Sequence, residues 1–199
     1  MAMLCALLLS ACASSTASKS DGLFDSALKV VGLQRAQEPP KELTLKVPEL
    51  EKPRKLTLRI HASQVLNTDD QQRSLALVTR VYRLKDKAAF LQTPYETFQD
   101  PALEKAALRD DLIDVKEVLL KPGGKHEVVQ TLTPETEYIG IVALFRAPAE
   151  QRWRFVFDAK ASSQAGITLG AHGCALSVAE GKAVDAPPET LRLAGVQCD

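Results

Sequence analysis

The chain has few of the residue types on which catalytic and nucleic-acid-binding proteins depend. It contains three histidines, its aromatic residues make up 5%, and 25 basic residues are balanced by 25 acidic ones. A protein that binds nucleic acid usually carries a basic excess and aromatic side chains on which bases stack. We therefore expect no nucleic-acid partner and no attachment to a membrane through surface charge.

Signatures of enzymes and metal sites are scarce as well. The sequence has no Gly-x-Ser-x-Gly elbow, no phosphate-binding loop and no dinucleotide fingerprint. Asp110 and Asp111 lie beside Arg109 ahead of a strand, where charges are normally solvated. His172 and Cys174 are two ligands only, which is too few for structural zinc, so His172 is predicted to be a solvated loop residue. We predict no catalytic residue, metal site, cofactor or small-molecule substrate, and hence a protein that is not an enzyme.

The N-terminus carries a short apolar run followed by Leu9-Ser10-Ala11-Cys12. This arrangement resembles a bacterial lipobox, in which the thiol accepts a diacylglyceryl group and a peptidase cuts before the cysteine. The run is too short to span a bilayer. We predict a signal peptide over 1–11, lipidation at Cys12 and a flexible tether over 12–21. The alternative is a generic apolar N-terminus with a chance cysteine. No Lys or Arg precedes Cys12, so the start of translation is expected further upstream.

Cys174 and Cys198 remain once Cys5 is assigned to the leader and Cys12 to the anchor. In an oxidising compartment an even pair predicts a disulfide, which adds roughly 3 kcal/mol in the chain-entropy model. The alternative is two unrelated thiols, one buried and one near the C-terminus.

Hydrophobic periodicity predicts a mainly β protein with two sheets packed as a sandwich over 56–199. Residues 22–55 are expected to hold a short helix (22–33) and a Pro-rich linker. From Leu56 apolar residues alternate with polar ones, which indicates a half-buried strand. Further strands are predicted at 75–84, 112–120, 126–132, 137–145 and 153–158, with weaker ones at 166–170 and 174–179. The run 137–145 is almost continuously apolar and is expected at the centre of a sheet.

A helical insert is predicted over 86–109, between the second and third strands. Thr93-Pro94-Tyr95-Glu96 has the spacing of a capping box, and Asp100-Pro101 is a second helix start. Leu103, Ala107 and Leu108 are expected to form the apolar face of the second helix. The insert should pack on the sandwich through Phe90, Tyr95, Phe98 and Leu108.

Several short runs occur in a combination of order and spacing that is fairly specific. They are Leu66–Asn67, Arg73–Leu75, Val81–Asp86, Phe90, Tyr95, Phe98, Pro122–Gly123, Tyr138–Phe145 and Trp153–Arg154. Together with the lipobox, these runs resemble the type VI secretion system outer-membrane lipoproteins, the TssJ (SciN/VasD) family. The resemblance covers most of Leu56 to Val178.

The resemblance implies a transthyretin-like sandwich that is lipid-anchored at the periplasmic face of the outer membrane. Such proteins hold the periplasmic C-terminal domain of the inner-membrane protein TssM. In relatives the loop between the first two strands is the contact element, which here corresponds to Gln64–Ser74. The implied partner-binding residues are Gln64, Val65, Leu66, Asn67, Thr68, Asp69, Asp70 and Gln71.

Alternatives remain open at two levels. Val65 and Leu66 are apolar in a polar loop, so they are either exposed contacts for a partner or a plug at the end of the core. For the whole chain, a hydrolase on the same sandwich is rejected because the histidines are scattered. A lipoprotein that carries or chaperones another periplasmic ligand is the alternative function. A large apolar cavity between the sheets would favour it.

Overall fold

The computed structural model describes residues 53–198. The predicted signal peptide, Cys12, the tether and the helix at 22–33 lie outside the described residues. The strands are β1 (Arg54–Ala62), β2 (Leu77–Leu84), β3 (Leu112–Leu120), β4 (Lys125–Leu132), β5 (Tyr138–Ala143), β6 (Arg154–Asp158), β7 (Ile167–Ala171), β8 (Leu176–Glu180) and β9 (Ala183–Val184). The helices are α2 (Ala88–Gln92), η1 (Tyr95–Gln99), α3 (Pro101–Leu108), η2 (Arg109–Asp111), α4 (Ala159–Ser162) and η3 (Pro188–Leu191).

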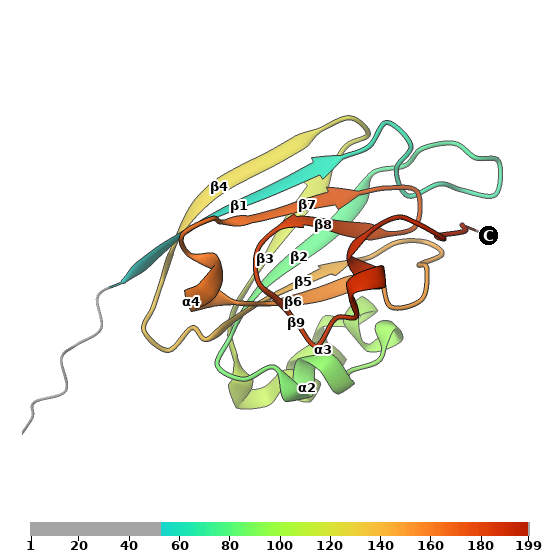
Figure 1. Ribbon diagram of the computed structural model, residues 1–199. Coiled ribbons are helices and arrows are strands. Elements are labelled where there is room, and N and C mark those ends of the chain that lie inside the picture. The colour runs from blue at the N-terminus through green and yellow to red at the C-terminus, as the bar shows by residue number, and fades with distance from the viewer. Residues whose placement is uncertain (1–52, 199) are drawn as a thin grey trace, which may run out of the picture. The chain divides into compact units, whose positions relative to one another are not determined.

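The strands form two sheets that pack face to face (Figure 1). One sheet has the order β4-β1-β7-β8 and the other the order β3-β2-β5-β6-β9. Neighbouring strands are antiparallel except β1 and β7, which are parallel. The predicted sandwich is confirmed, and β5 lies at the centre of its sheet as its apolar sequence indicated.

The core lies between the sheets and is built by period-two alternation. In β1 the side chains of Leu56, Leu58 and Ile60 are buried, whereas His61 on the opposite face is exposed. They pack in one cluster with Phe155 and Phe157 of the other sheet. β1 begins at Arg54, two residues before the predicted start, because its ladder with β4 extends to the pair Arg54–Leu132.

The connection between β3 and β4 crosses from one sheet to the other. β3 pairs with β2, whereas β4 pairs with β1. The turn contains Gly123 at φ +71°, where a Cβ would lie 2.4 Å from Nε2 of Gln64. The Gly123 amide donates to the carbonyl of Ser63 at 3.0 Å. The turn therefore supports the end of β1 at the point where the chain leaves it.

The predicted helical insert is present and packs on the outer face of the second sheet (Figure 1). Tyr82 of β2 contacts Phe90 and Phe98 edge to face, with ring centroids 5.2 and 5.9 Å apart. Leu108 is also buried in this cluster. Leu103, however, is 56% exposed, and Glu104 takes the inward position that the apolar pattern assigned to its neighbour.

One of the two predicted caps in the insert is confirmed. The Asp100 carboxylate accepts from the amides of Ala102 and Leu103 and so begins α3. The other cap is wrong, because the Thr93 hydroxyl donates to the carbonyl of Ala89 at 2.7 Å. Thr93 therefore ends α2, and the short 3₁₀ helix that follows has no side-chain cap.

Two arginines on the outer face of the sheet form hydrogen bonds with the insert. Arg80 of β2 donates to the carboxylate of Glu104 at 2.5 Å and to the carbonyl of Phe98 at 2.9 Å. The Arg154 guanidinium of β6 donates to carbonyls at and beyond the C-terminal end of α2, those of Phe90, Leu91 and Thr93. Burial lowers the pKa of Arg154. The insert thus covers the face of β6 on which Arg154 lies.

Candidate partner-binding surface

The loop between β1 and β2, residues 63–76, passes from one sheet to the other and extends beyond the end of the sandwich (Figure 1). It contains no helix or strand. Loops longer than about 12 residues without regular structure are uncommon in compact domains and usually have a function.

The structure brings the predicted partner-binding residues together in this loop but does not expose all of them. Gln64, Asp70 and Gln71 are exposed, and Val65 is 56% exposed. Leu66 is completely buried and belongs to the core between the sheets. The plug interpretation therefore holds for Leu66, whereas Val65 and Leu75 are the large apolar side chains that the loop exposes. Asn67 is also buried, whereas Thr68 and Asp69 are half-buried.

The tip of the loop is organised by Asp69. Its carboxylate accepts from the backbone amides of Gln71 and Arg73, both at 2.9 Å, and from Nε of Arg73 at 2.8 Å. The hydrogen bonds from the Arg73 backbone and side chain lower the pKa of Asp69 because they favour its charged form. Gln72 adopts a left-handed conformation at φ +61° within this turn. The tip is thus a defined turn.

The two sides of the loop are joined near its base by Ser74. The Ser74 hydroxyl donates to the carbonyl of Gln64 at 2.7 Å and accepts from the amide of Leu66 at 3.3 Å. The amide of Leu75 donates to the carbonyl of Leu66 at 2.9 Å. These bonds close the loop above the buried Leu66.

The neighbouring loops at this end of the sandwich hold the β1–β2 loop. Arg146, between β5 and β6, forms a two-point ion pair with Asp70 at 2.8 and 2.7 Å. Its hydrogen bonds lower the pKa of Asp70, and the carboxylate raises the pKa of Arg146. Between β7 and β8, the carbonyls of His172 and Gly173 accept from the amides of Asn67 and Thr68, both at 3.1 Å.

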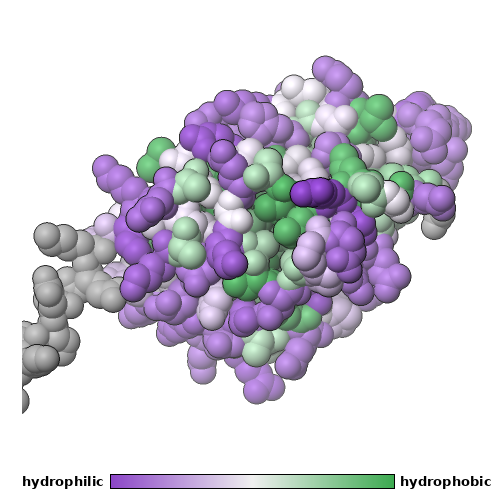
Figure 2. Space-filling view, in the orientation of Figure 1, coloured by the Kyte–Doolittle hydropathy of each residue, from purple (hydrophilic) through white to green (hydrophobic). Residues whose placement is uncertain are grey.

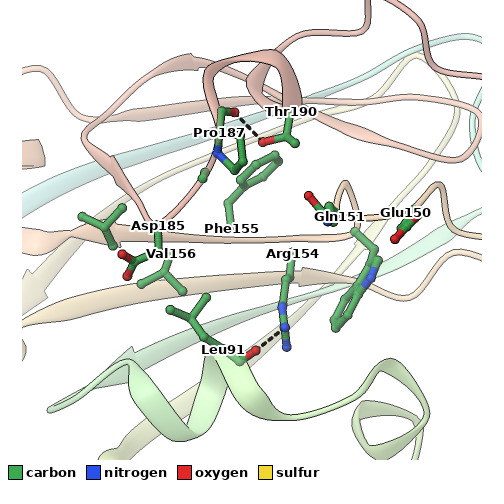
Figure 3. Close-up of a pocket in the computed structure, with 12 residues that line it drawn as sticks. Leu91, Glu150, Gln151, Arg154, Phe155, Val156, Asp185, Pro187 and Thr190 are labelled. Atoms are coloured by element: carbon green, nitrogen blue, oxygen red, sulfur yellow. Dashed lines mark hydrogen bonds between the residues drawn. The ribbon is translucent and has the colours of Figure 1, made fainter.

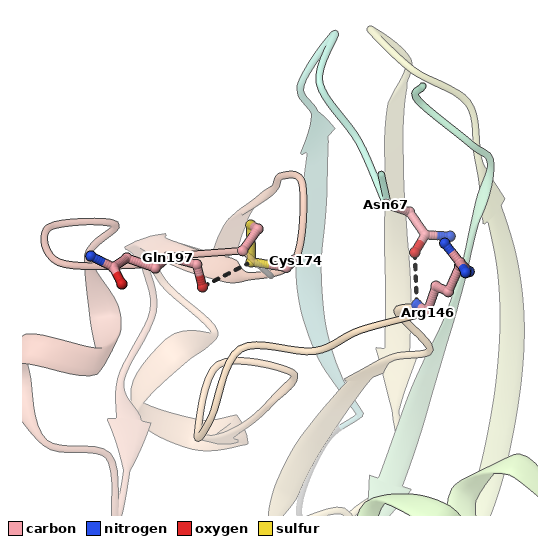
Figure 4. Close-up of a disulfide and its surroundings, with 5 residues drawn as sticks. Asn67, Arg146, Cys174 and Gln197 are labelled. Carbon is pink, nitrogen blue, oxygen red and sulfur yellow. Dashed lines mark hydrogen bonds between the residues drawn. A yellow bond between two sulfur atoms is a disulfide. The ribbon is translucent and has the colours of Figure 1, made fainter. Parts of the chain in front are cut away.

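The predicted disulfide between Cys174 and Cys198 is present, with Cα atoms 5.6 Å apart (Figure 4). Cys174 is therefore committed to a covalent bond and cannot ligate a metal. His172 is half-buried and not solvated as predicted. Its ring Nε2 lies 3.1 Å from the Ser177 hydroxyl, within hydrogen-bond distance. Burial lowers the pKa of His172.

Two grooves lie along the C-terminal segment 185–194. The groove in Figure 3 has a volume of about 500 Å³ and runs beside β6, where Phe155 points toward Pro187 and Arg154 toward Leu91. A second groove separates β8 from the C-terminal segment, and Figure 2 shows hydrophobic residues in the middle of this face. Between the sheets, inward side chains such as Ile141 and Leu169 fill the space. The large apolar cavity expected of a carrier is not found among residues 53–198.

Arg146, His172 and Gly173 were missed as parts of this surface when only the sequence was considered. Arg146 is separated from Asp70 by 76 positions, and no local pattern connects two residues so far apart. The contribution of His172 and Gly173 comes from backbone carbonyls, which any residue carries. The one available signal was that Arg146 directly follows the apolar run 137–145.

Comparison with known proteins gives a consistent result. Residues 54–174 match the family model described as the type VI secretion lipoproteins VasD, EvfM and TssJ. No curated protein sequence matches the chain. The structure is similar to the crystal structure of the lipoprotein TssJ1 from Pseudomonas aeruginosa, with a TM-score of 0.58 and 28% identity, over 68% of this chain and 100% of that one.

Two further solved structures are similar. A chain of a structure described as a type VI membrane complex has a TM-score of 0.59 and 27% identity, over 64% of this chain and 99% of that one. A chain of a structure described as the TssM C-terminal domain from EAEC has a TM-score of 0.54 and 27% identity, over 63% and 98%. Since the family model covers most of the two sheets, the resemblance in the sequence is confirmed, and the chain belongs to the TssJ family of type VI secretion lipoproteins.

Proposed function

We propose that this lipoprotein is anchored to the periplasmic face of the outer membrane and holds the periplasmic C-terminal domain of TssM through the β1–β2 loop. The observation that carries the proposal is the loop itself. It is long, closed by internal hydrogen bonds and exposed at Val65, Asp70 and Gln71, on a sandwich whose core is filled. Binding residues are commonly placed on loops that a rigid scaffold positions.

Membrane attachment is proposed to come from acyl chains on Cys12. Within residues 53–198 no helix combines the length and apolar character needed to cross a membrane. The lipobox at Leu9–Cys12 supplies the thiol. Two or more acyl chains hold a protein at a membrane stably, whereas one holds it only marginally.

The loop assignment is tested by a charge at its exposed apolar residue. We expect Val65→Glu to weaken binding of the TssM periplasmic domain by about tenfold or more, because an apolar contact would be replaced by a charge that must be desolvated. Titration calorimetry with the full chain in detergent measures the dissociation constant.

The matched control is Val129→Glu in β4, because Val129 is 61% exposed against 56% for Val65 and lies outside the loop. This variant should bind as the wild type does. If Val65→Glu binds as tightly as the wild type, the loop is not part of the interface.

The anchor is tested by palmitate labelling and fractionation of the cell envelope. We expect the wild type to carry label and to fractionate with the outer membrane, whereas Cys12→Ser should carry none and leave that fraction. Wild-type protein recovered unlabelled from the periplasmic fluid would contradict the proposal.

The alternative function, a carrier or chaperone for another periplasmic ligand, needs an enclosed apolar site. The inward side chains of the two sheets leave no such site in the described region, so the structure gives this alternative no support.

A further inference from the structure

Asn67 has the environment of a structural residue although it lies in an exposed loop. It is only 7% exposed and adopts a left-handed conformation at φ +43°. Asparagine tolerates this conformation better than most residues, because its short polar side chain can form local hydrogen bonds. A buried amide side chain is stable only if its donors and acceptor are satisfied.

The hydrogen bonds of Asn67 join three segments that are distant in sequence. Its Oδ1 accepts from the backbone amide of Arg146 at 2.8 Å, across 79 positions (Figure 4). Its Nδ2 donates to the carbonyl of Ala76 at 2.9 Å, at the far end of its own loop. Its backbone amide donates to the carbonyl of His172 at 3.1 Å. One residue thus connects both ends of the β1–β2 loop to two neighbouring loops.

Arg146 extends this connection toward the tip. Its backbone is bonded to Asn67, and its guanidinium reaches Asp70 with two parallel hydrogen bonds. Two-point pairing of a guanidinium with a carboxylate fixes orientation as well as distance. The segment between Asn67 and Asp70 is therefore held at both ends by one residue of another loop.

We propose that Asn67 and Arg146 are positioning residues that hold the β1–β2 loop in its partner-binding conformation, so that the partner meets a preformed surface. This inference rests on the proposed function of the loop. It changes the role of Asn67 from contact residue to support, and it adds Arg146 to the site. A loop that is ordered before binding loses less conformational entropy on association, which favours affinity.

The test of Asn67 is Asn67→Gly. Glycine accepts the left-handed backbone, so the variant removes the two side-chain hydrogen bonds without introducing strain. We expect faster hydrogen exchange at the amides of Thr68 and Leu75, unchanged exchange in β1 and β5, and about tenfold weaker binding of the TssM periplasmic domain. Gln72→Gly is the matched control for exchange, because Gln72 is also left-handed but its side chain is exposed. It should leave the amide of Thr68 protected.

The test of Arg146 is a charge exchange. Arg146→Asp places two carboxylates side by side and should weaken binding several-fold. It should also speed hydrogen exchange at the amide of Thr68, because the segment between Asn67 and Asp70 is then held at one end only. Adding Asp70→Arg re-forms the pair with reversed charges and should return exchange at Thr68 to the wild-type rate. Because Asp70 is itself exposed in the contact surface, exchange and not affinity decides this test. Exchange at Thr68 that stays slow in Arg146→Asp, or stays fast in the double variant, would overturn the positioning role of Arg146.

The outcomes separate this inference from the proposed function. If Asn67→Gly frees the loop amides but leaves binding unchanged, while Val65→Glu weakens it, the preformed surface is wrong and the loop remains the contact. If hydrogen exchange at the amides of Thr68 and Leu75 stays slow in Asn67→Gly, the Asn67 side chain does not hold the loop, and its positioning role is wrong. If Val65→Glu also binds normally, the loop assignment itself fails.

Discussion

Glu104 shows how a single charged residue determines the seating of the helical insert. It is 4% exposed, and its carboxylate is paired with Arg80 of β2. The apolar periodicity of 101–108 places Leu103 inward, because it depends only on the residues of the helix. It does not include Arg80, which lies on the sheet that faces the helix. Arg80 reverses this preference, since its half-buried guanidinium is stabilised by a carboxylate that faces it.

Removing this carboxylate is expected to destabilise the protein. Glu104→Ala should lower the free energy of unfolding by about 2 kcal/mol, because the half-buried Arg80 guanidinium then keeps only the Phe98 carbonyl and the largely exposed carboxylate of Glu117. Urea denaturation measures the change. Glu96→Ala, an exposed acidic residue of the same insert, is the control and should stay within about 0.5 kcal/mol of the wild type. A loss below about 1 kcal/mol in Glu104→Ala would show that the pair contributes little.

At the scale of elements, the sequence was most informative where turn residues mark both ends of a strand. β3 was predicted with its observed bounds and β4 within one residue, because turns on either side interrupt the pattern. The two-residue β9 was not predicted, since it is too short to show any period. The sheet to which each strand belongs was also not predictable. A turn such as Pro122–Gly124 can close a hairpin or cross between sheets, and the partner strand decides which.

The candidate site could be predicted only in part for a similar reason. Residues 64–71 are consecutive and lie between two predicted strands, so they are found in one loop as expected. Which of them face outward depends on groups contributed from elsewhere. Leu66 is buried by core residues of both sheets, and Asn67 by loops that begin far along the sequence.

For the molecule as a whole, the disulfide fixes the C-terminal segment across one side of the sandwich. The Arg152 guanidinium holds this segment further back, through the carbonyls of Glu189, Arg192 and Ala194. Reduction should therefore lower stability by roughly 3 kcal/mol, since the cross-link restricts the unfolded chain. The corresponding fall in melting temperature is about 6–12 °C.

Thermal denaturation with and without dithiothreitol measures this fall. The double variant Cys174→Ser/Cys198→Ser is the control: it should melt near the temperature of the reduced wild type and be insensitive to the reagent. An unchanged melting temperature of the reduced wild type would mean that the cross-link adds nothing to the folded state.

The course of β1 has a mechanical consequence. Its first residue, Arg54, continues the N-terminal part that carries Cys12, and its last residue, Ala62, leads into the proposed contact loop. The chain that leads to the proposed anchor and the proposed contact loop therefore join opposite ends of one strand, about 26 Å apart. Tension between the membrane and the partner would therefore run along the covalent backbone of β1, which its ladders with β4 and β7 hold extended. Covalent bonds and not ladder hydrogen bonds would carry that load, so force could pass from the proposed anchor to the proposed contact loop without unfolding the sandwich.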